Sequence, residues 1–286
     1  MLFRIQLLAG DSKRGPCPPL NTNMCIPMDV TTHISLPREG SYFEGHFPGQ
    51  PILPGVAQLA LVQEALAKAG MSLPLREITF TRLRQIVLPG DTLELTTRKS
   101  EDDRLRFELK RDNKLVTNGE LLFGPLTSPD ESAPSVVEKD NFINGIPPME
   151  ALLPHRSPML FVQSVLSEAE DSIACEVSIP SACALVHEGS ASAVAGIEAA
   201  AQAAAAWEAL QRSHAGGAAA ARVGYLVAIR DVTFFVERIP ADIPLQVRVE
   251  LEAAALPLSH YRMDLFLDGK PLVRGSFATF LAQNEP

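Results

Sequence analysis

Residues 43–56 read Phe43-Glu44-Gly45-His46-Phe47-Pro48-Gly49-Gln50-Pro51-Ile52-Leu53-Pro54-Gly55-Val56, a histidine in a loop rich in glycine and proline. The loop leads directly into an apolar segment that predicts a helix over Gly55–Ala69. Because an imidazole titrates near neutral pH, His46 is a candidate acid or base. The first N–H groups of a helix lack intrahelical acceptors, so the helix start beside His46 is a candidate oxyanion site. This combination indicates chemistry on a carbonyl or a thioester.

The segments that follow the histidine loop occur twice in the chain. Each copy has an apolar helix, alternating strands with Pro-Gly or Pro-Ala breaks, and a two-residue hairpin signal. The hairpin signals are Asp112-Asn113 in the first copy and Asp268-Gly269 in the second. The second helix is predicted over Ala195–Gln211. A chain of 286 residues therefore contains two domains of similar size.

A known family has the same loop. Gly45-His46-Phe47-Pro48 and Pro54-Gly55-Val56 resemble, at matching spacing, the active-site loop of the hotdog-fold 3-hydroxyacyl-ACP dehydratases. The resemblance extends from roughly Asp29 to Leu281 and implies an α+β tandem hotdog, each half an antiparallel sheet wrapped around a central helix. It also implies that the two sheets associate side by side as an intrachain pseudo-dimer, with further self-association left open.

Each half lacks one catalytic group of that family. The family's helix carries an acidic residue where this chain has Ala60, and Glu64 one turn later is a weaker substitute. The second half resembles the family at Leu152-Leu153-Pro154-His155-Arg156 and in the helix around Glu198. Its position equivalent to His46 is Ala184, with His187 nearby. The complementary losses resemble the two-component dehydratase of aryl polyene biosynthesis.

The resemblance implies specific roles at one composite site. His46 removes the α-proton of a 3-hydroxyacyl thioester and Glu198 protonates the departing hydroxyl, which gives a trans-2-enoyl product in fatty-acid or aryl-polyene-type biosynthesis. The expected oxyanion and substrate-binding residues are Gly55, Val56, Phe47 and Pro54. The implied partner is acyl carrier protein bearing a phosphopantetheine-linked substrate, with Arg84 and Arg82 as candidate contacts. No metal or cofactor is expected.

Other residues have simpler interpretations. His155-Arg156 is interpreted as a structural pair before the second core helix, and the region of Ala184 and His187 together with Ala60 as an abandoned second site. A rival interpretation makes His187, with Glu64 or Glu188, an unorthodox second centre. Two further functions stay open: a hotdog acyl-thioester hydrolase, and a non-catalytic acyl-binding or scaffolding protein.

Composition and the distribution of polar and proline-rich segments indicate the partners, the location and the domain boundaries. The net charge of −9 and the pI near 5.2 argue against nucleic acid as a partner. The first residues do not read as a signal peptide and no segment reads as a membrane span, so a cytoplasmic protein is expected. The predicted domains are a poorly ordered extension at 1–27, a histidine-bearing hotdog at 28–124, a linker at 125–140 and a glutamate-bearing hotdog at 141–286.

Overall fold

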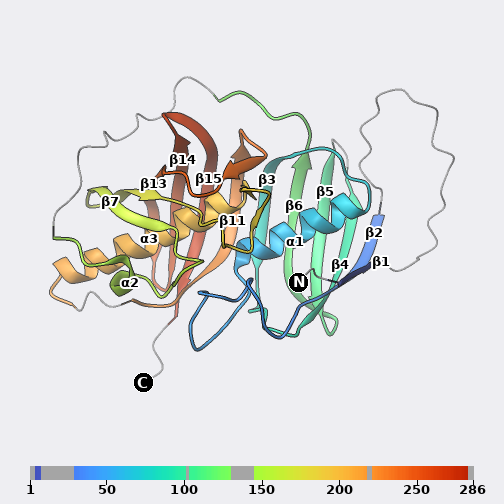
Figure 1. Cartoon of the computed structure of the whole chain (residues 1–286), viewed down its shortest axis with the longest axis horizontal. Coiled ribbons are helices and arrows are strands. Elements are labelled where there is room, and N and C mark those ends of the chain that lie inside the picture. The colour runs from blue at the N-terminus through green and yellow to red at the C-terminus, as the bar shows by residue number, and fades with distance from the viewer. Residues whose placement is uncertain (1–3, 8–28, 101–102, 130–144, 218–220, 283–286) are drawn as a thin grey trace.

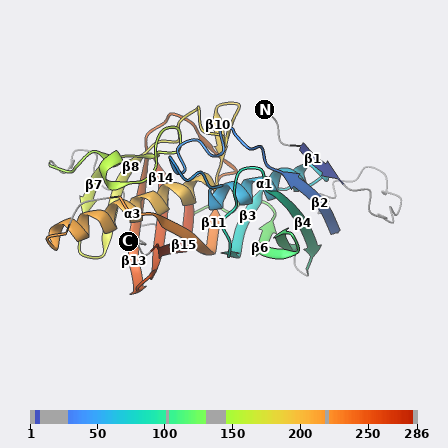
Figure 2. The same ribbon diagram turned by 90° about the horizontal axis from the view of Figure 1, so that it is seen from below.

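Two long helices lie across one face of a continuous antiparallel sheet (Figures 1 and 2). The structure is a computed structural model that describes residues 4–7, 29–100, 103–129, 145–217 and 221–282. Most of the predicted N-terminal extension and of the predicted linker lies outside these ranges. The elements of the two halves fall within residues 29–123 and 149–281, and the domain boundaries themselves stay predictions.

The first half places five strands against helix α1. Helix α1 (Gly55–Lys68) begins directly after Pro54, and Gly70, with φ +99°, allows the chain to turn away after its end. The strands are β2 (Asp29–Ser35), β3 (Leu75–Leu83), β4 (Thr92–Lys99), β5 (Arg104–Arg111) and β6 (Lys114–Phe123), in the spatial order β2-β4-β5-β6-β3. A strand that the sequence did not predict, β1 (Arg4–Leu7), pairs with the outer edge of β2.

The second half repeats this plan around helix α3. Helix α3 (Ala195–His214) is three residues longer than predicted and buries its alanine-rich face against the sheet. The strands of the sheet are β7 (Val162–Glu168), β8 (Ser172–Val177), β11 (Gly224–Phe234), β13 (Leu245–Ala255), β14 (Leu258–Leu267) and β15 (Lys270–Leu281), in the order β11-β15-β14-β13-β8-β7. A short helix α2 (Met149–Leu152) precedes them.

The halves join edge to edge. Strand β3 pairs antiparallel with β11, with Arg82 opposite Ala228 and Glu77 opposite Thr233, so twelve strands form one sheet. Apolar side chains from both helices and from the inner face of the sheet form one connected core. The predicted α+β double hotdog is confirmed, with each sheet wrapped around its helix.

The predicted hairpins are also present. Asp112 and Asn113 have φ values of +49° and +62° between β5 and β6, as a tight hairpin turn requires. Asp268 and Gly269 have φ values of +47° and +80° between β14 and β15. The sequence did not predict a small second sheet of β9 (Val186–His187), β10 (Ser190–Ser192) and β12 (Arg238–Pro240), which precedes and flanks the start of α3.

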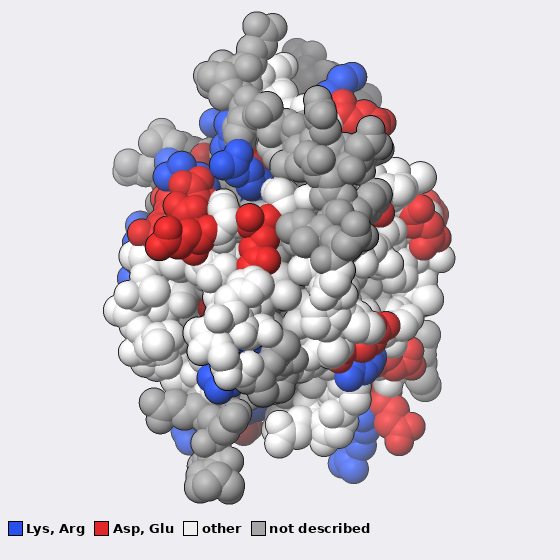
Figure 3. Space-filling view, turned by 90° about the vertical axis from the view of Figure 1, so that its left-hand side faces the viewer, with Lys and Arg blue, Asp and Glu red and all other residues white. Residues whose placement is uncertain are grey.

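The surface carries charges of both signs. On the side of the molecule shown in Figure 3, the described Lys and Arg residues lie in small groups among acidic and uncharged residues. This distribution agrees with the acidic composition and offers no broad basic face on that side to a nucleic acid. In the described part of the chain, no helix combines the length and the apolar character that a membrane crossing would need.

Candidate active site

His46 is buried in the loop that precedes α1, and backbone contacts fix its ring. The main chain of His46 accepts a hydrogen bond from Ile52 N at 3.0 Å, and the ring Nδ1 lies 3.2 Å from Ile52 O. Because a carbonyl oxygen can only accept, Nδ1 carries the proton and Nε2 is left with its lone pair. The ring of Phe47 stacks on the imidazole with 4.1 Å between centroids. His46 is therefore held in the tautomer of a base.

Glu198 lies in the first turn of α3, and its side chain is buried. Gln202, one turn along the same helix, donates from Nε2 to Glu198 Oε1 at 3.1 Å. The same amide donates to Met159 O at 2.7 Å and accepts from Phe161 N at 2.8 Å. These bonds fix the amide and therefore orient the carboxylate toward the junction of the halves.

His155 lies beside the predicted acid, a contact that the sequence did not predict. Its Nε2 lies 3.2 Å from Glu198 Oε1, both side chains are buried, and its ring centroid is 5.2 Å from that of His46. Among the described residues, His155 Nδ1 is one of few buried polar side-chain atoms with no hydrogen-bond partner. His155 thus does more than shape the entry to the second hotdog: it contacts the predicted acid directly.

The surroundings shift the protonation of both predicted catalytic groups. Burial lowers the pKa of His46 to about 4, although the nearby Glu198 carboxylate opposes this shift. Burial alone would raise the pKa of Glu198, but the hydrogen bond and charge of His155, with His46 and Gln202, outweigh it and lower that pKa to about 2. At neutral pH the site therefore holds a neutral imidazole at His46 and an ionised carboxylate paired with His155.

A cavity of about 50 Å³ brings these groups together at the junction of the halves. Its wall includes His46 and Gly55 from the first half and His155 and Glu198 from the second. It also includes Ala201, Ala205, Glu208, Arg212, Arg222 and Leu226. The structure therefore places the predicted base and acid in one cavity, although they are far apart in the sequence.

The other predicted site residues take different places. Gly55 is in the cavity wall, whereas Phe47, Pro54 and Val56 are buried behind it and hold the loop and the helix start in position. A Cβ on Gly55 would lie 2.8 Å from Leu83 Cδ2, so only glycine fits here without a shift of its neighbours. Arg82 and Arg84 are exposed at the end of β3 and outside the cavity wall, and Arg84 Nε donates to Asn118 Oδ1 at 3.2 Å.

The same three side chains are also the candidate metal ligands. In the described ranges, His46, His155 and Glu198 form the one group of at least three ligating side chains whose donor atoms lie within 4.8 Å of one another. Two imidazoles and a carboxylate are a donor set that zinc accepts, although this spacing would have to contract for bonds of about 2 Å.

The cavity and the paired hotdogs define a class of protein, a double-hotdog dehydratase. Two family models divide the chain between them: the ApeI-like model, described as ApeI dehydratase, matches residues 25–120, and the ApeP-like model, described as ApeP dehydratase, matches residues 147–285. Each model covers one of the two halves, the first the histidine-bearing half and the second the glutamate-bearing half.

Curated dehydratases are similar in sequence to part of the chain. The chain is 33% identical over 109 residues to the 3-hydroxyacyl-[acyl-carrier-protein] dehydratase FabZ of Lactobacillus helveticus, covering 32% of this chain and 70% of that protein. It is 39% identical over 101 residues to FabZ of a Roseiflexus species, covering 29% of this chain and 66% of that protein. The chain belongs to the hotdog-fold 3-hydroxyacyl-ACP dehydratase family, and it is a lyase.

Solved structures agree on the fold. A trans-AT polyketide synthase dehydratase domain from Brevibacillus brevis superposes with a TM-score of 0.67 at 13% identity, covering 89% of this chain and 94% of that one. The dehydratase domain from the CurJ module of curacin polyketide synthase gives a TM-score of 0.64 at 11% identity, covering 95% and 96%. At these identities the likeness concerns the fold alone. The predicted resemblance to a two-component dehydratase is confirmed by the two family models, one for each half.

Proposed function

We propose that the protein dehydrates a 3-hydroxyacyl thioester on acyl carrier protein to the trans-2-enoyl thioester, at one composite site between its halves. The observation that supports this most is the enclosure of His46, His155 and Glu198 in one cavity, with donor atoms within 4.8 Å of one another. The ApeI and ApeP dehydratase matches to the separate halves agree with it. A cytoplasmic location stays a prediction.

The test is to mix the purified protein with a 3-hydroxyacyl carrier protein and follow the carrier by mass spectrometry. We expect loss of one water from the acyl group and an ultraviolet absorbance typical of the conjugated enoyl thioester. Release of free thiol without loss of water would identify a thioester hydrolase instead. Binding of the carrier without either change would identify a non-catalytic acyl-binding protein.

His46 acts as the base in this proposal. The thioester already acidifies the α-carbon, so a neutral imidazole is sufficient to remove the proton and no metal is used. The N–H of Gly55, in the first turn of α1, stabilises the thioester oxygen as negative charge develops on it. Phe47 and the Ile52 carbonyl hold the ring so that its free Nε2 faces the substrate.

The acid is the His155–Glu198 pair rather than Glu198 alone. In contact with His155, Glu198 has a pKa of about 2, so its carboxylate holds no proton of its own to give at neutral pH. The pair can hold one, shared along the 3.2 Å contact between His155 Nε2 and Glu198 Oε1. Glu198 passes this proton to the departing hydroxyl as the C–O bond breaks, water leaves, and the proton that His46 has accepted returns to the pair through solvent.

Replacing His155 with glutamine tests this pair. We expect kcat at neutral pH to fall by about 10-fold or more, because general acid catalysis contributes on the order of 10²-fold. We also expect the pH–kcat profile to change shape, because the hydrogen bond and charge of His155 lower the pKa of Glu198 and a glutamine carries no such charge. A profile that keeps its shape while kcat and Tm fall together would mean that His155 only supports the fold. Arg156→Gln, at the next residue, is the control.

The halves act as an intrachain pseudo-dimer with a single working site. Ala60 occupies the acid position on α1, and the exposed His187 lies near it on β9. Replacing His187 with alanine should therefore change kcat by less than about twofold, since this region has no facing acid at the family position. A His187→Ala protein that loses half its turnover, together with a His46→Ala protein that keeps the other half, would demonstrate two active centres.

Arg84 is the proposed contact for the acidic carrier protein. It is exposed, so reversal of its charge should not disturb the core. We expect Arg84→Glu to raise KM several-fold for a carrier-bound substrate but not for the same acyl group on free pantetheine, and to leave kcat unchanged. Equal changes in KM for both substrates would show that Arg84 does not contact the carrier protein. Arg98→Glu, an exposed residue on β4, is the matched charge reversal.

A further inference from the structure

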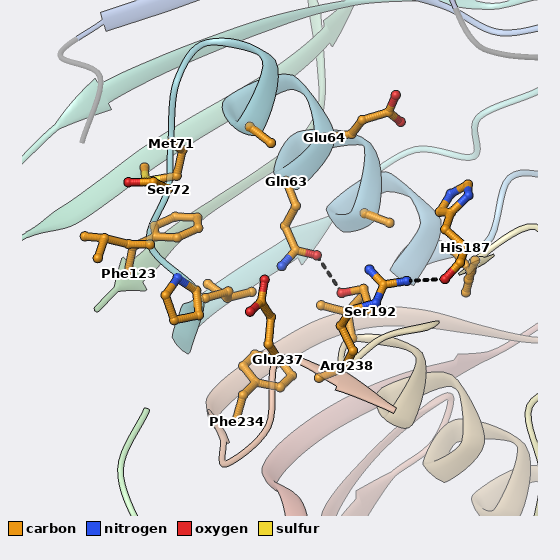
Figure 4. Close-up of a pocket in the computed structure, with 18 of the residues that line it drawn as sticks. Gln63, Glu64, Met71, Ser72, Phe123, His187, Ser192, Phe234, Glu237 and Arg238 are labelled. Atoms are coloured by element: carbon orange, nitrogen blue, oxygen red, sulfur yellow. Dashed lines mark hydrogen bonds between the residues drawn. The ribbon is translucent and has the colours of Figure 1, made fainter. Parts of the chain in front are cut away.

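A second, larger cavity lies on the other side of the junction. It has a volume of about 450 Å³, within the roughly 300–1,000 Å³ range of small-molecule sites. One wall comes from α1 and the loop that follows it, and the other comes from the small sheet and the residues just before α3 (Figure 4). Most of its surface is apolar, with contributions from Met71, Leu75, Phe123, Leu185, Val194 and Phe234.

This cavity occupies the position related to the catalytic cavity by the internal repeat. When α1 and α3 are aligned at Ala60 and Glu198, Gln63 corresponds to Ala201, and Ala67 to Ala205. The first residue of each pair lines the large cavity and the second lines the catalytic one. The two cavities are thus the same place in the two hotdogs, and only one of them has kept the acid and the buried histidine.

The polar groups of the large cavity favour an uncharged ligand. Glu64 and Glu237 present carboxylates, and Glu64 is paired with Lys68 at 2.7 Å. The guanidinium of Arg238 already donates to Ser190 and to His187 O. A free carboxylate or phosphate in the cavity would therefore meet two like charges without an uncommitted guanidinium to offset them.

Gln63 is the polar group best placed for such a ligand. It projects from α1 toward Ser192 and Glu237 of the second half, and its Oε1 accepts a hydrogen bond from Ser192 Oγ at 2.8 Å (Figure 4). An amide that spans the junction in this way can exchange its partner for an amide of a ligand at little cost. The ligand that fits therefore has an apolar chain for the cavity and amide groups that can reach Gln63. An acyl-pantetheine arm has both.

We propose that this cavity binds the acyl-pantetheine arm of a second thioester and holds it without reaction. The choice of ligand rests on the proposed function, whereas the site itself rests on the cavity and its place in the repeat. Because Ala60 replaces the acid, a bound 3-hydroxyacyl group meets no proton donor at the position that Glu198 has in the catalytic cavity, and it stays intact. The cavity is therefore a holding site for substrate or product, lined by residues of α1 and by the residues just before α3.

The probe is octanoyl-pantetheine with N–H in place of the thioester sulfur, which has no hydroxyl to eliminate and resists hydrolysis. Native mass spectrometry and titration count the molecules bound per chain. We expect two for the unmodified protein. Ala60→Phe fills the large cavity and should leave one, with at least about 10-fold weaker binding at that place. Ala205→Phe fills the catalytic cavity and should also leave one, and the double variant should leave none.

The outcomes separate the holding site from the catalytic function. If only one probe molecule binds per chain, and this binding is lost in Ala205→Phe but not in Ala60→Phe, the holding site is overturned. The dehydratase proposal then stays intact. Two molecules per chain, with the expected loss in each variant but no dehydration of a 3-hydroxyacyl carrier, support the holding site and overturn the catalytic proposal. If octanoate binds to the unmodified protein but not to the Ala60→Phe variant, the assignment to an uncharged ligand is overturned. Thermal melting of each variant verifies its folding.

Discussion

His46→Ala and Glu198→Gln should each lower kcat by about 10²-fold or more while leaving the fold intact. The alanine variant has no base for the α-proton, and the glutamine variant keeps the shape of the side chain but cannot pass a proton to the hydroxyl. Steady-state kinetics with a 3-hydroxyacyl carrier measures both effects. Combining the two variants should cost little more than either one, because the base and the acid act in one step.

The control for this experiment removes the imidazole of a histidine outside the catalytic cavity. His33 is partly exposed on β2, 3.7 Å from Glu94, and His33→Ala should keep full activity. Near-normal turnover in a well-folded His46→Ala or Glu198→Gln protein would refute the assignment. The pH dependence provides a second check: His46 is neutral above its pKa of about 4, so the acid limb of the pH–kcat profile should lie near that value.

The free energy of unfolding should also depend on the protonation of His46, over a related range of pH. An unfolded chain binds a proton at His46 below pH about 6.5, whereas the folded chain resists it down to about 4. Since the unfolded state then binds more protons, the contribution of this group to the free energy of unfolding decreases as the pH falls from about 6.5 to 4. The lowered pKa of Glu198 acts in the same direction at lower pH.

Gly45→Ala should disrupt the junction between the halves. Gly45 has φ +78°, and a Cβ there would lie 2.0 Å from Arg156 O, across the contact in which Arg156 N donates to Gly45 O at 3.0 Å. The halves must move apart to admit the methyl group, and His46 moves with its neighbour. We expect a loss of at least about 2 kcal/mol in the free energy of unfolding and a kcat reduced about 10-fold or more.

Gly49 separates the two causes of that loss. It lies in the same loop with φ +85°, yet a Cβ there would contact nothing within 4 Å. Gly49→Ala therefore incurs only the backbone strain, expected at about 1 kcal/mol, and should keep its activity. Denaturant unfolding and kinetics should be measured for both variants. The difference between them gives the effect of the clash with Arg156 alone. Equal effects would mean that the contact between Gly45 and Arg156 does not matter.

The local patterns of the sequence were sufficient for the two long helices and the hairpins, whereas the pairing of His46 with Glu198 was implied by the resemblance to the dehydratase family. Asp112-Asn113 and Asp268-Gly269 are signals that depend on nearest neighbours alone. The role of His155 depends instead on how the segment before β7 folds back onto the start of α3, a contact between residues far apart in the chain. The available signal was a histidine in a Pro-His-Arg context in the half that lacks a counterpart of His46.

The small sheet of β9, β10 and β12 was missed for a similar reason. Its strands contain two or three residues each, too short for an alternating pattern to show. Their pairing brings Arg238 against Ser190 and His187, a set that no spacing in the sequence connects. The larger cavity, which this sheet borders, was consequently expected only as an abandoned site and not as an open volume.

The pairing of β3 with β11 within one chain also has a consequence for how the enzyme is produced. Two separate hotdogs must find each other, and a histidine-bearing half that paired with its own copy would face Ala60 instead of an acid. A covalent tether raises the effective concentration of the correct partner to the millimolar range and fixes the ratio of the halves at one to one. Under the proposed function, synthesis of one chain yields one complete site, whatever the expression level.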